Sequence, residues 1–275
     1  MRMDKPIGIY LLLWPCVWAL WIAAQGTPPL LILLVFIAGT IVMRAAGCVI
    51  NDIADRNIDG AVKRTMQRPL ASKELSTKQA LGCFLGLALC ALLLVLTLNW
   101  QTVLLAFGGL ALTVSYPFMK RYTHLPQVVL GAAFGWSIPM AFMAINQQLS
   151  EVVWYLYAAN LCWTVAYDTE YAMVDRDDDL KIGVKSTAIL FAQFDKAIIF
   201  ILQMMTLVLL ARVTYLANLS WPVWLALALC FQLFLYQQYL IKDRLRDQCF
   251  QAFLHNHWVG LSMAVGIITH YLLQV

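Results

Sequence analysis

Charged side chains are scarce in this chain of 275 residues. They make up 12% of it, whereas 62% of the residues are hydrophobic and the mean hydropathy is +0.73. A soluble domain carries roughly 25% charged residues, so this chain cannot cover a water-exposed surface of ordinary size. The composition therefore predicts an integral membrane protein, with a single transmembrane domain over residues 1–275 and no room for a large soluble domain.

Several chemical motifs are also missing. The seven cysteines are scattered, mostly through apolar runs, and no C-x-x-C pair or His/Cys zinc spacing occurs. The absence of a G-x-G-x-x-G loop, a Walker loop and a G-x-S-x-G elbow leaves dinucleotide, nucleoside triphosphate and serine-hydrolase chemistry without support. The net charge of +4 includes no long basic run, so we expect no nucleic-acid partner.

Long apolar runs are what the sequence has in abundance. They predict an all-α, polytopic bundle of nine transmembrane helices, because strands of a membrane barrel would be shorter and would alternate in polarity. The expected spans cover residues 7–25, 28–50, 76–98, 101–118, 126–145, 151–169, 197–216, 219–240 and 251–273.

Basic residues are confined to one side of this bundle. Of the 19 Lys and Arg residues, only Arg212 falls near the short connections that carry no basic residue. By the positive-inside rule, the side rich in Lys and Arg is cytoplasmic. We therefore expect the N-terminus and the charged loops in the cytoplasm and, after nine spans, the C-terminus on the opposite side of the membrane.

An acidic segment follows the second span, where residues 51–59 read NDIADRNID. If the helix continues through it, the side chains that carry oxygen ligands fall within a stripe about 100° wide on one face. They are Asn51, Asp52, Asp55 and Asp59.

A second acidic segment, residues 168–179, repeats the arrangement at the end of the sixth span. Its side chains on one helical face are Asp168, Tyr171, Asp175 and Asp179. Both segments contain D-x-x-x-D, and both lie where a span meets the cytoplasm. The two copies indicate an internal repeat of a three- or four-helix unit.

Two matched acidic stripes at a membrane surface call for a cation. Carboxylates four residues apart on a helix repel, and the repulsion grows near the low dielectric of a membrane. Ligand sets made only of oxygen favour hard ions, and Mg²⁺ uses one or two carboxylates together with substrate phosphate oxygens. We therefore predict a magnesium site that holds a polyphosphate. The alternative is that the acids are simply solvated or paired with nearby Lys and Arg.

Basic residues near the stripes fit the same interpretation. Arg44 stands out, because it lies about two helical turns inside the second span, where an ionised side chain marks a functional site with an anionic partner. Lys120 and Arg121, between the fourth and fifth spans, are candidates for contact with a diphosphate. Six others can be explained either by contact with a diphosphate or by membrane topology: Arg56, Lys63, Arg64, Arg68, Lys181 and Lys185. For Lys63, Arg64, Lys181 and Lys185, topology is the better explanation.

At these motifs the sequence resembles the UbiA superfamily of intramembrane aromatic prenyltransferases, whose signatures are N-D-x-x-D-x-x-x-D and a second D-x-x-x-D. The likeness extends over essentially the whole chain and is closest to bacterial members that act on 4-hydroxybenzoate. Four further blocks carry it: KPIG at 5–8, MRAAGC at 43–48, YPFMKRYTHLPQ at 116–127 and YDTEYAMVDRDDD at 167–179.

The resemblance implies a bundle of helices around a central cavity, in the inner membrane of a bacterium, with the C-terminus in the periplasm. It implies a polyprenyl diphosphate bound through Mg²⁺, with its tail leaving sideways into membrane lipid. The polyprenyl group would be transferred to the ring carbon ortho to the hydroxyl of 4-hydroxybenzoate. The product would be a ubiquinone precursor, and diphosphate would be released.

The resemblance also implies roles for individual residues. Asn51, Asp52, Asp55 and Asp59 resemble the first metal and diphosphate set, and Asp175 and Asp179 the second. Asp175 is also a candidate for deprotonating the phenol. Lys120 and Arg121 are candidates for the diphosphate, and Arg44 for the substrate carboxylate or a diphosphate oxygen. Asp168 and Tyr171 either orient Asp175 and contact substrate or pack between helices.

Other functions stay open at this point. Within the same chemistry, the acceptor could be a naphthoate, haem or chlorophyll precursor. A secondary transporter or ion channel also contains intramembrane acids and repeats, although its sites usually lie near the middle of the bilayer. A structural membrane scaffold would leave the two acidic stripes unexplained.

Overall fold

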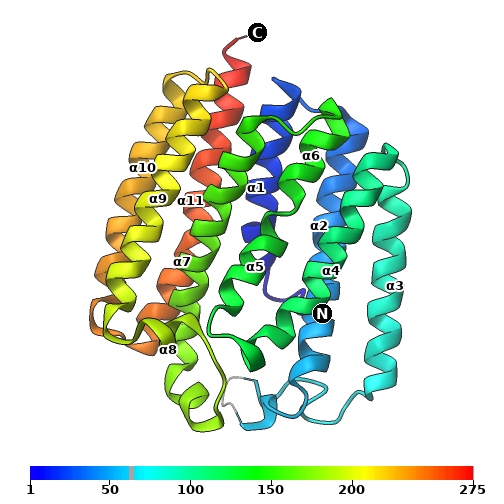
Figure 1. Cartoon of the computed structure of the whole chain (residues 1–275), viewed down its shortest axis with the longest axis vertical. Helices are drawn as coiled ribbons and strands as arrows, with labels where there is room; N and C mark the ends of the chain where they lie inside the picture. Colours follow the sequence, from blue (N-terminus) through cyan, green and yellow to red (C-terminus); the bar gives the residue numbers. More distant parts are fainter. Residues whose placement is uncertain (62–64, 275) are drawn as a thin grey trace.

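The computed structural model describes residues 1–61 and 65–274, and these form an all-helical bundle (Figure 1). The α-helices are α1 (Ile7–Ala24), α2 (Leu30–Asp55), α3 (Thr77–Val95), α4 (Trp100–Tyr122), α5 (Pro126–Gly135), α6 (Ser137–Asn146), α7 (Glu151–Ile182), α8 (Thr187–Phe191), α9 (Asp195–Leu216), α10 (Trp221–Leu240) and α11 (Arg246–Leu272). Three short 3₁₀ helices are η1 (Asp59–Ala61), η2 (Ala192–Phe194) and η3 (Ile241–Asp243).

The described residues form nine helical rods of membrane length, as the sequence predicted. Helices α5 and α6 are joined end to end and count as one rod, and α8 is a short connector. Seven stretches are long and apolar enough to cross a membrane by composition alone. The other two rods, α7 and α11, carry polar residues that face the inside of the bundle, among them Glu170 and Asn256. The protein is a multi-pass membrane protein.

The helix ends follow local capping chemistry. Ser76 caps α3, because its hydroxyl accepts from the Gln79 backbone N–H at 3.3 Å while the Gln79 side chain accepts from the Ser76 N–H at 2.9 Å. Asn99 caps α4, because its side-chain oxygen accepts from the Thr102 backbone N–H at 2.9 Å, and its side-chain nitrogen donates to the Met143 carbonyl at 2.9 Å. That second bond ties the start of α4 to the end of α6.

Three boundaries differ from the sequence prediction. Helix α2 runs past the predicted end at residue 50 but stops at Asp55, so Asp59 lies in η1 and not on the same helical face as Asp55. Helix α7 runs 32 residues, to Ile182, so the whole second acidic segment is helical. The span predicted at 126–145 is broken at Trp136.

The break between α5 and α6 is stabilised by contacts with both neighbouring helices, α4 and α7. The Trp136 indole donates to the Leu105 carbonyl of α4 at 2.6 Å, and its ring packs over the α4 glycines Gly108 and Gly109. The Tyr157 hydroxyl of α7 donates to the Ala132 carbonyl at 3.0 Å. In lipid a broken helix needs such partners for its freed carbonyls.

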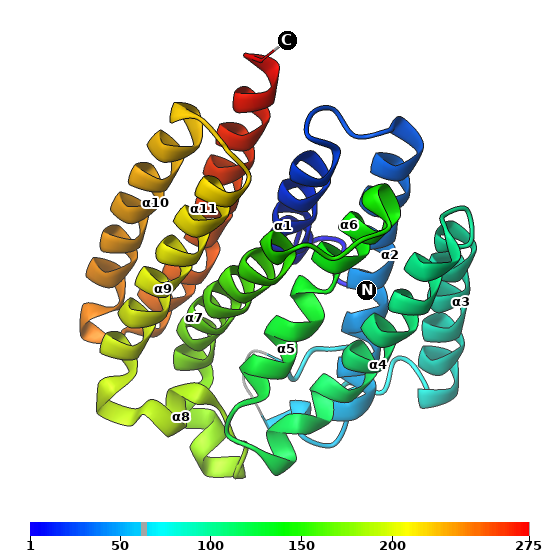
Figure 2. The ribbon, with the colours of Figure 1, turned by 45° about the horizontal axis from the view of Figure 1, so that its top comes forward.

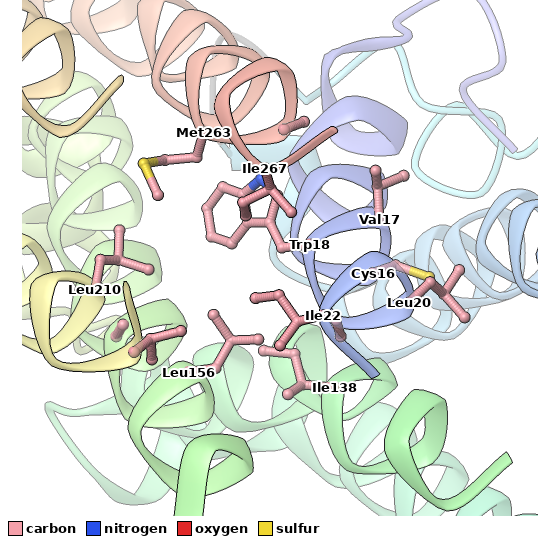
Figure 3. Packing of buried hydrophobic residues seen from close by; sticks show 14 of the residues in the cluster. Cys16, Val17, Trp18, Leu20, Ile22, Ile138, Leu156, Leu210, Met263 and Ile267 are labelled. Atoms are coloured by element: carbon pink, nitrogen blue, oxygen red, sulfur yellow. The ribbon is translucent and has the colours of Figure 1, made fainter. Parts of the chain in front are cut away.

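The main core lies where α1, α6, α7, α9 and α11 meet (Figure 3). Trp18 of α1 stacks on Trp163 of α7 with ring centroids 5.4 Å apart, and Ile138, Leu156 and Met263 close the space around them. Figure 2 shows α9, α10 and α11 grouped beside α7 at one edge of the molecule and α3 at the other. Helices α1, α5 and α6 lie between these two groups.

A buried polar network joins α7, α9, α10 and α11. The Asn256 amide donates to Glu170 at 2.9 Å and accepts from the Trp163 indole at 2.8 Å. The Gln203 amide donates to Gln237 at 2.9 Å and to Glu170 at 3.4 Å. All these polar side chains are at most 1% exposed, so the bonds hold α7 against the last three helices.

The loops with the acidic and basic residues lie at one end of the bundle, and the C-terminus lies at the other (Figure 1). At the first end the Lys185 backbone N–H donates to the Lys120 carbonyl at 3.2 Å. The Thr187 N–H donates to the Gln127 side chain at 3.1 Å. The segment after α7 is thereby fixed to the segment between α4 and α5.

Candidate active site

A cavity of about 1160 Å³ penetrates the bundle. Its polar end is lined by residues from the N-terminal segment, α2, α4 and α7; they include Arg2, Arg44, Asn51, Asp52, Tyr116 and Asp168. Its apolar part is walled mainly by α3 and α4, with Leu85, Leu89 and Phe107 among the lining residues. These three side chains are more than half exposed, which indicates that the cavity is open to the outside along α3 and α4.

The first acidic segment reaches the polar end through Asn51 and Asp52, whereas Asp55 and Asp59 are not among the described residues that line the cavity. Asp52, Asp55 and Asp59 are 9%, 2% and 5% exposed. The Asn51 side-chain oxygen Oδ1 accepts a hydrogen bond from the Tyr116 hydroxyl at 3.0 Å, and this bond fixes the orientation of the Asn51 side chain. Although Asp59 has left the helix, it stays close to the others because it shares a basic partner with Asp52.

That shared partner is Arg68. One guanidinium nitrogen lies 2.7 Å from Asp59 Oδ2 and 3.2 Å from Asp52 Oδ1. Arg2, from the N-terminal segment, approaches the same Asp52 oxygen at 2.9 Å. Lys120 forms an ion pair with Asp55. Buried carboxylates require such partners, and the cations come from three separate parts of the chain.

The pKa of the Asp59 carboxyl is raised, chiefly because burial disfavours its charged form. The Asp55 carboxylate raises it further, while Arg68 acts in the opposite direction. A cation in addition to Arg68 would therefore stabilise the ionised form of this group.

The second acidic segment is only partly at the cavity. Asp168 and Tyr171 line it, opposite the first segment. Asp175 and Asp179 follow on the same helix and do not appear among the described residues that line the cavity. Two neighbours have basic partners at the end of α7, where Arg246 lies 3.3 Å from Asp177 and 3.0 Å from Asp178.

The other predicted basic residues divide into three groups. Arg121 donates to the Ala54 carbonyl at the end of α2, next to Asp55. Arg44 lines the cavity, and its guanidinium donates to the Cys48 sulfur one turn along α2. Lys63 and Arg64 lie outside the described residues.

The oxygen ligands fit a divalent metal, although no preformed cluster is present. Within residues 1–61 and 65–274, no three His, Cys, Asp or Glu side chains are grouped as a metal site. Asp55 Oδ1, however, is buried and has no hydrogen-bond partner among the described residues. A buried carboxylate oxygen without a partner, beside an amide and two further carboxylates, is suited to a hard ion that completes its shell with substrate oxygens.

Sequence reasoning gave no site role to Arg2 or Tyr116, and for Arg68 it left contact with a diphosphate and membrane topology both open. Arg2 and Tyr116 lie far along the chain from their partners, 50 and 65 residues away. For Arg68 a signal existed, since it follows the acidic segment closely enough to fold back on it. The two acidic segments are brought to one end of the bundle, as the spacing of the spans predicted.

Comparison with known proteins gives consistent results. A model of the UbiA prenyltransferase family matches residues 12–260. A protein of Pseudoalteromonas atlantica, named 4-hydroxybenzoate octaprenyltransferase, is 58% identical over 98% of this chain and 95% of its own length. A protein of the same name from Cronobacter sakazakii is 59% identical over 99% of this chain and 94% of its own.

Solved structures share the fold. The apo structure of a UbiA homolog from Aeropyrum pernix superimposes with a TM-score of 0.85 and 24% identity, over 98% of each chain. A UbiA homolog from Archaeoglobus fulgidus bound to GPP and Mg²⁺ gives a TM-score of 0.70 and 16% identity, over 96% of this chain and 99% of that one.

Proposed function

Because the chain belongs to the UbiA prenyltransferase family, we propose that it transfers a polyprenyl group from a polyprenyl diphosphate to 4-hydroxybenzoate. The new bond forms at the ring carbon ortho to the hydroxyl, and the products are 3-polyprenyl-4-hydroxybenzoate and diphosphate. This reaction belongs to ubiquinone biosynthesis. Membership in a family of prenyltransferases decides against the transporter, channel and scaffold alternatives.

The observation that carries the proposal is the cavity itself. It joins a buried, charged end to an apolar passage that opens between α3 and α4. A polyprenyl diphosphate has the same two parts, a polyanionic head and a long hydrocarbon tail. The tail would leave through the side opening into lipid, so the passage need not enclose its full length.

At the charged end, Asn51, Asp52, Asp55 and Asp59 would hold Mg²⁺ from α2 and η1, with Asp175 and Asp179 as the second set on α7. When bound, Mg²⁺ supplies positive charge that stabilises the departing diphosphate. The unpartnered oxygen of Asp55 supports this assignment. The oxygen-only ligand set favours Mg²⁺ over softer ions.

Three basic residues around these acids would bind the diphosphate. Arg68 pairs with Asp59 and Lys120 with Asp55. Arg121 donates to the Ala54 carbonyl, next to Asp55. Their charge would stabilise the negative charge that grows on the leaving oxygen as the allylic carbon–oxygen bond breaks. The Tyr116 hydroxyl holds Asn51 in the orientation that this site uses.

The acceptor would lie between the charged end and Arg44. Arg44 is deeper along α2 than Asn51, and a guanidinium pairs with a carboxylate through two parallel hydrogen bonds. With its carboxylate on Arg44, the ring can direct its hydroxyl and ortho carbon toward the diphosphate end, near Asp168 and Tyr171. Asp175 is our candidate for accepting the phenol proton, and the apolar walls keep water from the allylic cation.

The orientation in the membrane belongs to the same proposal. The acidic and basic loops lie at one end of the bundle (Figure 1), and the positive-inside rule makes that end cytoplasmic. The protein would then lie in the inner membrane of a bacterium, with its active-site loops and N-terminus in the cytoplasm and its C-terminus in the periplasm.

The test is prenyl transfer by the purified chain in lipid, with geranyl diphosphate and radiolabelled 4-hydroxybenzoate. We expect extractable prenylated acid with Mg²⁺ and none after addition of EDTA. Asp55→Asn should abolish the product. The control Asp247→Asn changes an exposed acid in the first turn of α11 and should leave the amount of product unchanged. Product from another aromatic acceptor but not from 4-hydroxybenzoate would refute the substrate, and transfer to no acceptor would refute the reaction.

A further inference from the structure

Gly8, in the first turn of α1, lies directly under the guanidinium of Arg44. A Cβ atom added to Gly8 would be 2.5 Å from Arg44 Nη2 and 2.6 Å from Cζ, and it would also collide with Nε. All three distances are far inside van der Waals contact. The Arg44 guanidinium therefore lies against the backbone of Gly8, and any side chain larger than that of glycine would occupy its space.

The other side of the guanidinium is held by α2 itself. Arg44 Nη1 donates to the sulfur of Cys48, which is buried, and Gly8, Arg44 and Cys48 all line the cavity. Among the described residues, no carboxylate lies within ion-pair distance of Arg44, whereas Arg2, Arg68 and Lys120 each have one. A cation fixed between two helices inside a membrane protein, with no acid of its own, calls for an anionic ligand.

We propose that Gly8 is a specificity-determining position for the aromatic acid, because its missing side chain seats the Arg44 guanidinium against α1 and aims it at the substrate carboxylate. The inference rests on the proposed function, in which that carboxylate belongs to 4-hydroxybenzoate. Two parallel hydrogen bonds tolerate little displacement, so moving the guanidinium by the width of a methyl group would break the pairing.

A methyl group at Gly8 should displace Arg44 and leave the helices in place. The atoms that it would meet are the far end of a flexible side chain and not backbone. Alanine also has a higher helix propensity than glycine, so the change does not weaken α1 itself. Gly8→Ala is therefore expected to act on acceptor binding and not on folding.

Steady-state kinetics and direct binding to the full chain in lipid test this. Gly8→Ala should raise both the KM and the calorimetric Kd for 4-hydroxybenzoate at least tenfold, with the KM for geranyl diphosphate changed less than twofold. The matched control is Gly82→Ala in α3, where nothing lies within 4 Å of the added Cβ, and it should behave as the wild type. A Gly8→Ala protein that does not fold would contradict the claim that Arg44 moves and the helices do not.

A double-mutant cycle separates the role of Arg44 from simple loss of space. In an Arg44→Ala background, Gly8→Ala should change the Kd for 4-hydroxybenzoate less than twofold, because no guanidinium remains to be displaced. Gly8→Ala should also remove the preference for the acid over neutral 4-hydroxybenzamide. Additive effects, or equal weakening for acid and amide, would overturn the inference.

The binding arm distinguishes this inference from the proposed function. If the wild-type chain binds 4-hydroxybenzoate but transfers nothing to it, the proposed function fails, and the Kd of Gly8→Ala still decides the inference. If the wild type is active and Gly8→Ala matches it, only the inference fails. If the wild type does not bind the acid at all, both are refuted.

Discussion

Arg68 is the residue on which the first acidic segment converges, because it contacts Asp52 and Asp59 at once. In the proposed reaction the same guanidinium is within reach of diphosphate oxygens. Its loss would leave two buried carboxylates short of positive charge and would remove a charged hydrogen-bond donor from the substrate.

We expect Arg68→Ala to lower kcat/KM for the prenyl diphosphate about 10- to 100-fold, since a hydrogen bond to a charged group contributes about 1.5–3 kcal/mol. The measurement is the initial rate at saturating 4-hydroxybenzoate. The control is Arg56→Ala, an exposed arginine of the same segment that donates to the Ile53 carbonyl at 2.8 Å. Equal losses in the two variants would contradict the role of Arg68.

At this scale the sequence predicts types of residue better than partners. Periodicity correctly placed Asp52 and Asp55 on α2, because i and i+3 neighbours share a helical face. It was wrong for Asp59, since the helix ends at Asp55 and the chain turns before η1. The approach of Arg2 to Asp52 depends on how α1 packs beside α2, and no local pattern encodes that.

At the scale of elements, the polar network between α7 and α9–α11 explains why α7 and α11 are less apolar than the other membrane-length helices. Asn256 is a fully buried asparagine within α11, and it satisfies both Glu170 and the Trp163 indole. Such side chains lower the apolarity of a helix while strengthening its contacts with other helices.

Asn256→Leu should therefore destabilise the protein. Leucine is similar in size to asparagine but forms no hydrogen bonds, so the Trp163 indole N–H and a Glu170 carboxyl oxygen would lose this partner. We expect a loss of about 1–3 kcal/mol in stability, measured as a lower midpoint of thermal inactivation in detergent. Gln251→Leu, at an exposed position of the same helix, serves as the control. An unchanged midpoint for Asn256→Leu would show that the network adds nothing to stability.

The sequence predicted nine spans but not the break in the fifth. Pro139 has no N–H to donate to the Gly135 carbonyl, which weakens the helix at this point. The Trp136 ring packs over Gly108 and Gly109 of α4, a contact between helices that local hydropathy cannot reveal. Hydropathy ended the sixth span at residue 169, because the last turns of α7 are charged, but the spacing of the second acidic segment predicted that the helix continues, as it does to Ile182.

At the scale of the whole molecule, the number of rods decides where the termini lie. An odd number of spans puts the two ends of the chain on opposite sides of the membrane. The basic loops meet at the end of the bundle that also holds the acidic segments (Figure 1), and the C-terminus is at the other end.

Reporter fusions check this topology in a bacterial host. Alkaline phosphatase, which is active only in the periplasm, should be active when fused after residue 275 and inactive when fused after Lys242, at the loop before α11. Green fluorescent protein at the same two positions should give the reverse pattern. Active phosphatase at Lys242 would invert the orientation and refute a cytoplasmic active site.

The composition and the two acidic segments were enough to predict a membrane bundle with its chemistry at one end. The shape of the cavity was not predictable, because it arises where α3 and α4 stand apart, and their apolar residues look the same in sequence whether they face lipid or substrate. The hydrogen bond from the Lys185 N–H to the Lys120 carbonyl, which joins the segment after α7 to the end of α4, is equally a property of the folded chain.

The side opening between α3 and α4 has a consequence for the way the enzyme meets its substrates. Because Leu85, Leu89 and Phe107 line the cavity and are more than half exposed, a prenyl chain would enter and leave from the bilayer without crossing water. The relevant concentration of donor is then its mole fraction in the bilayer. Adding inert lipid at constant protein and donor should slow the reaction by surface dilution, while the aromatic acid continues to follow ordinary bulk saturation.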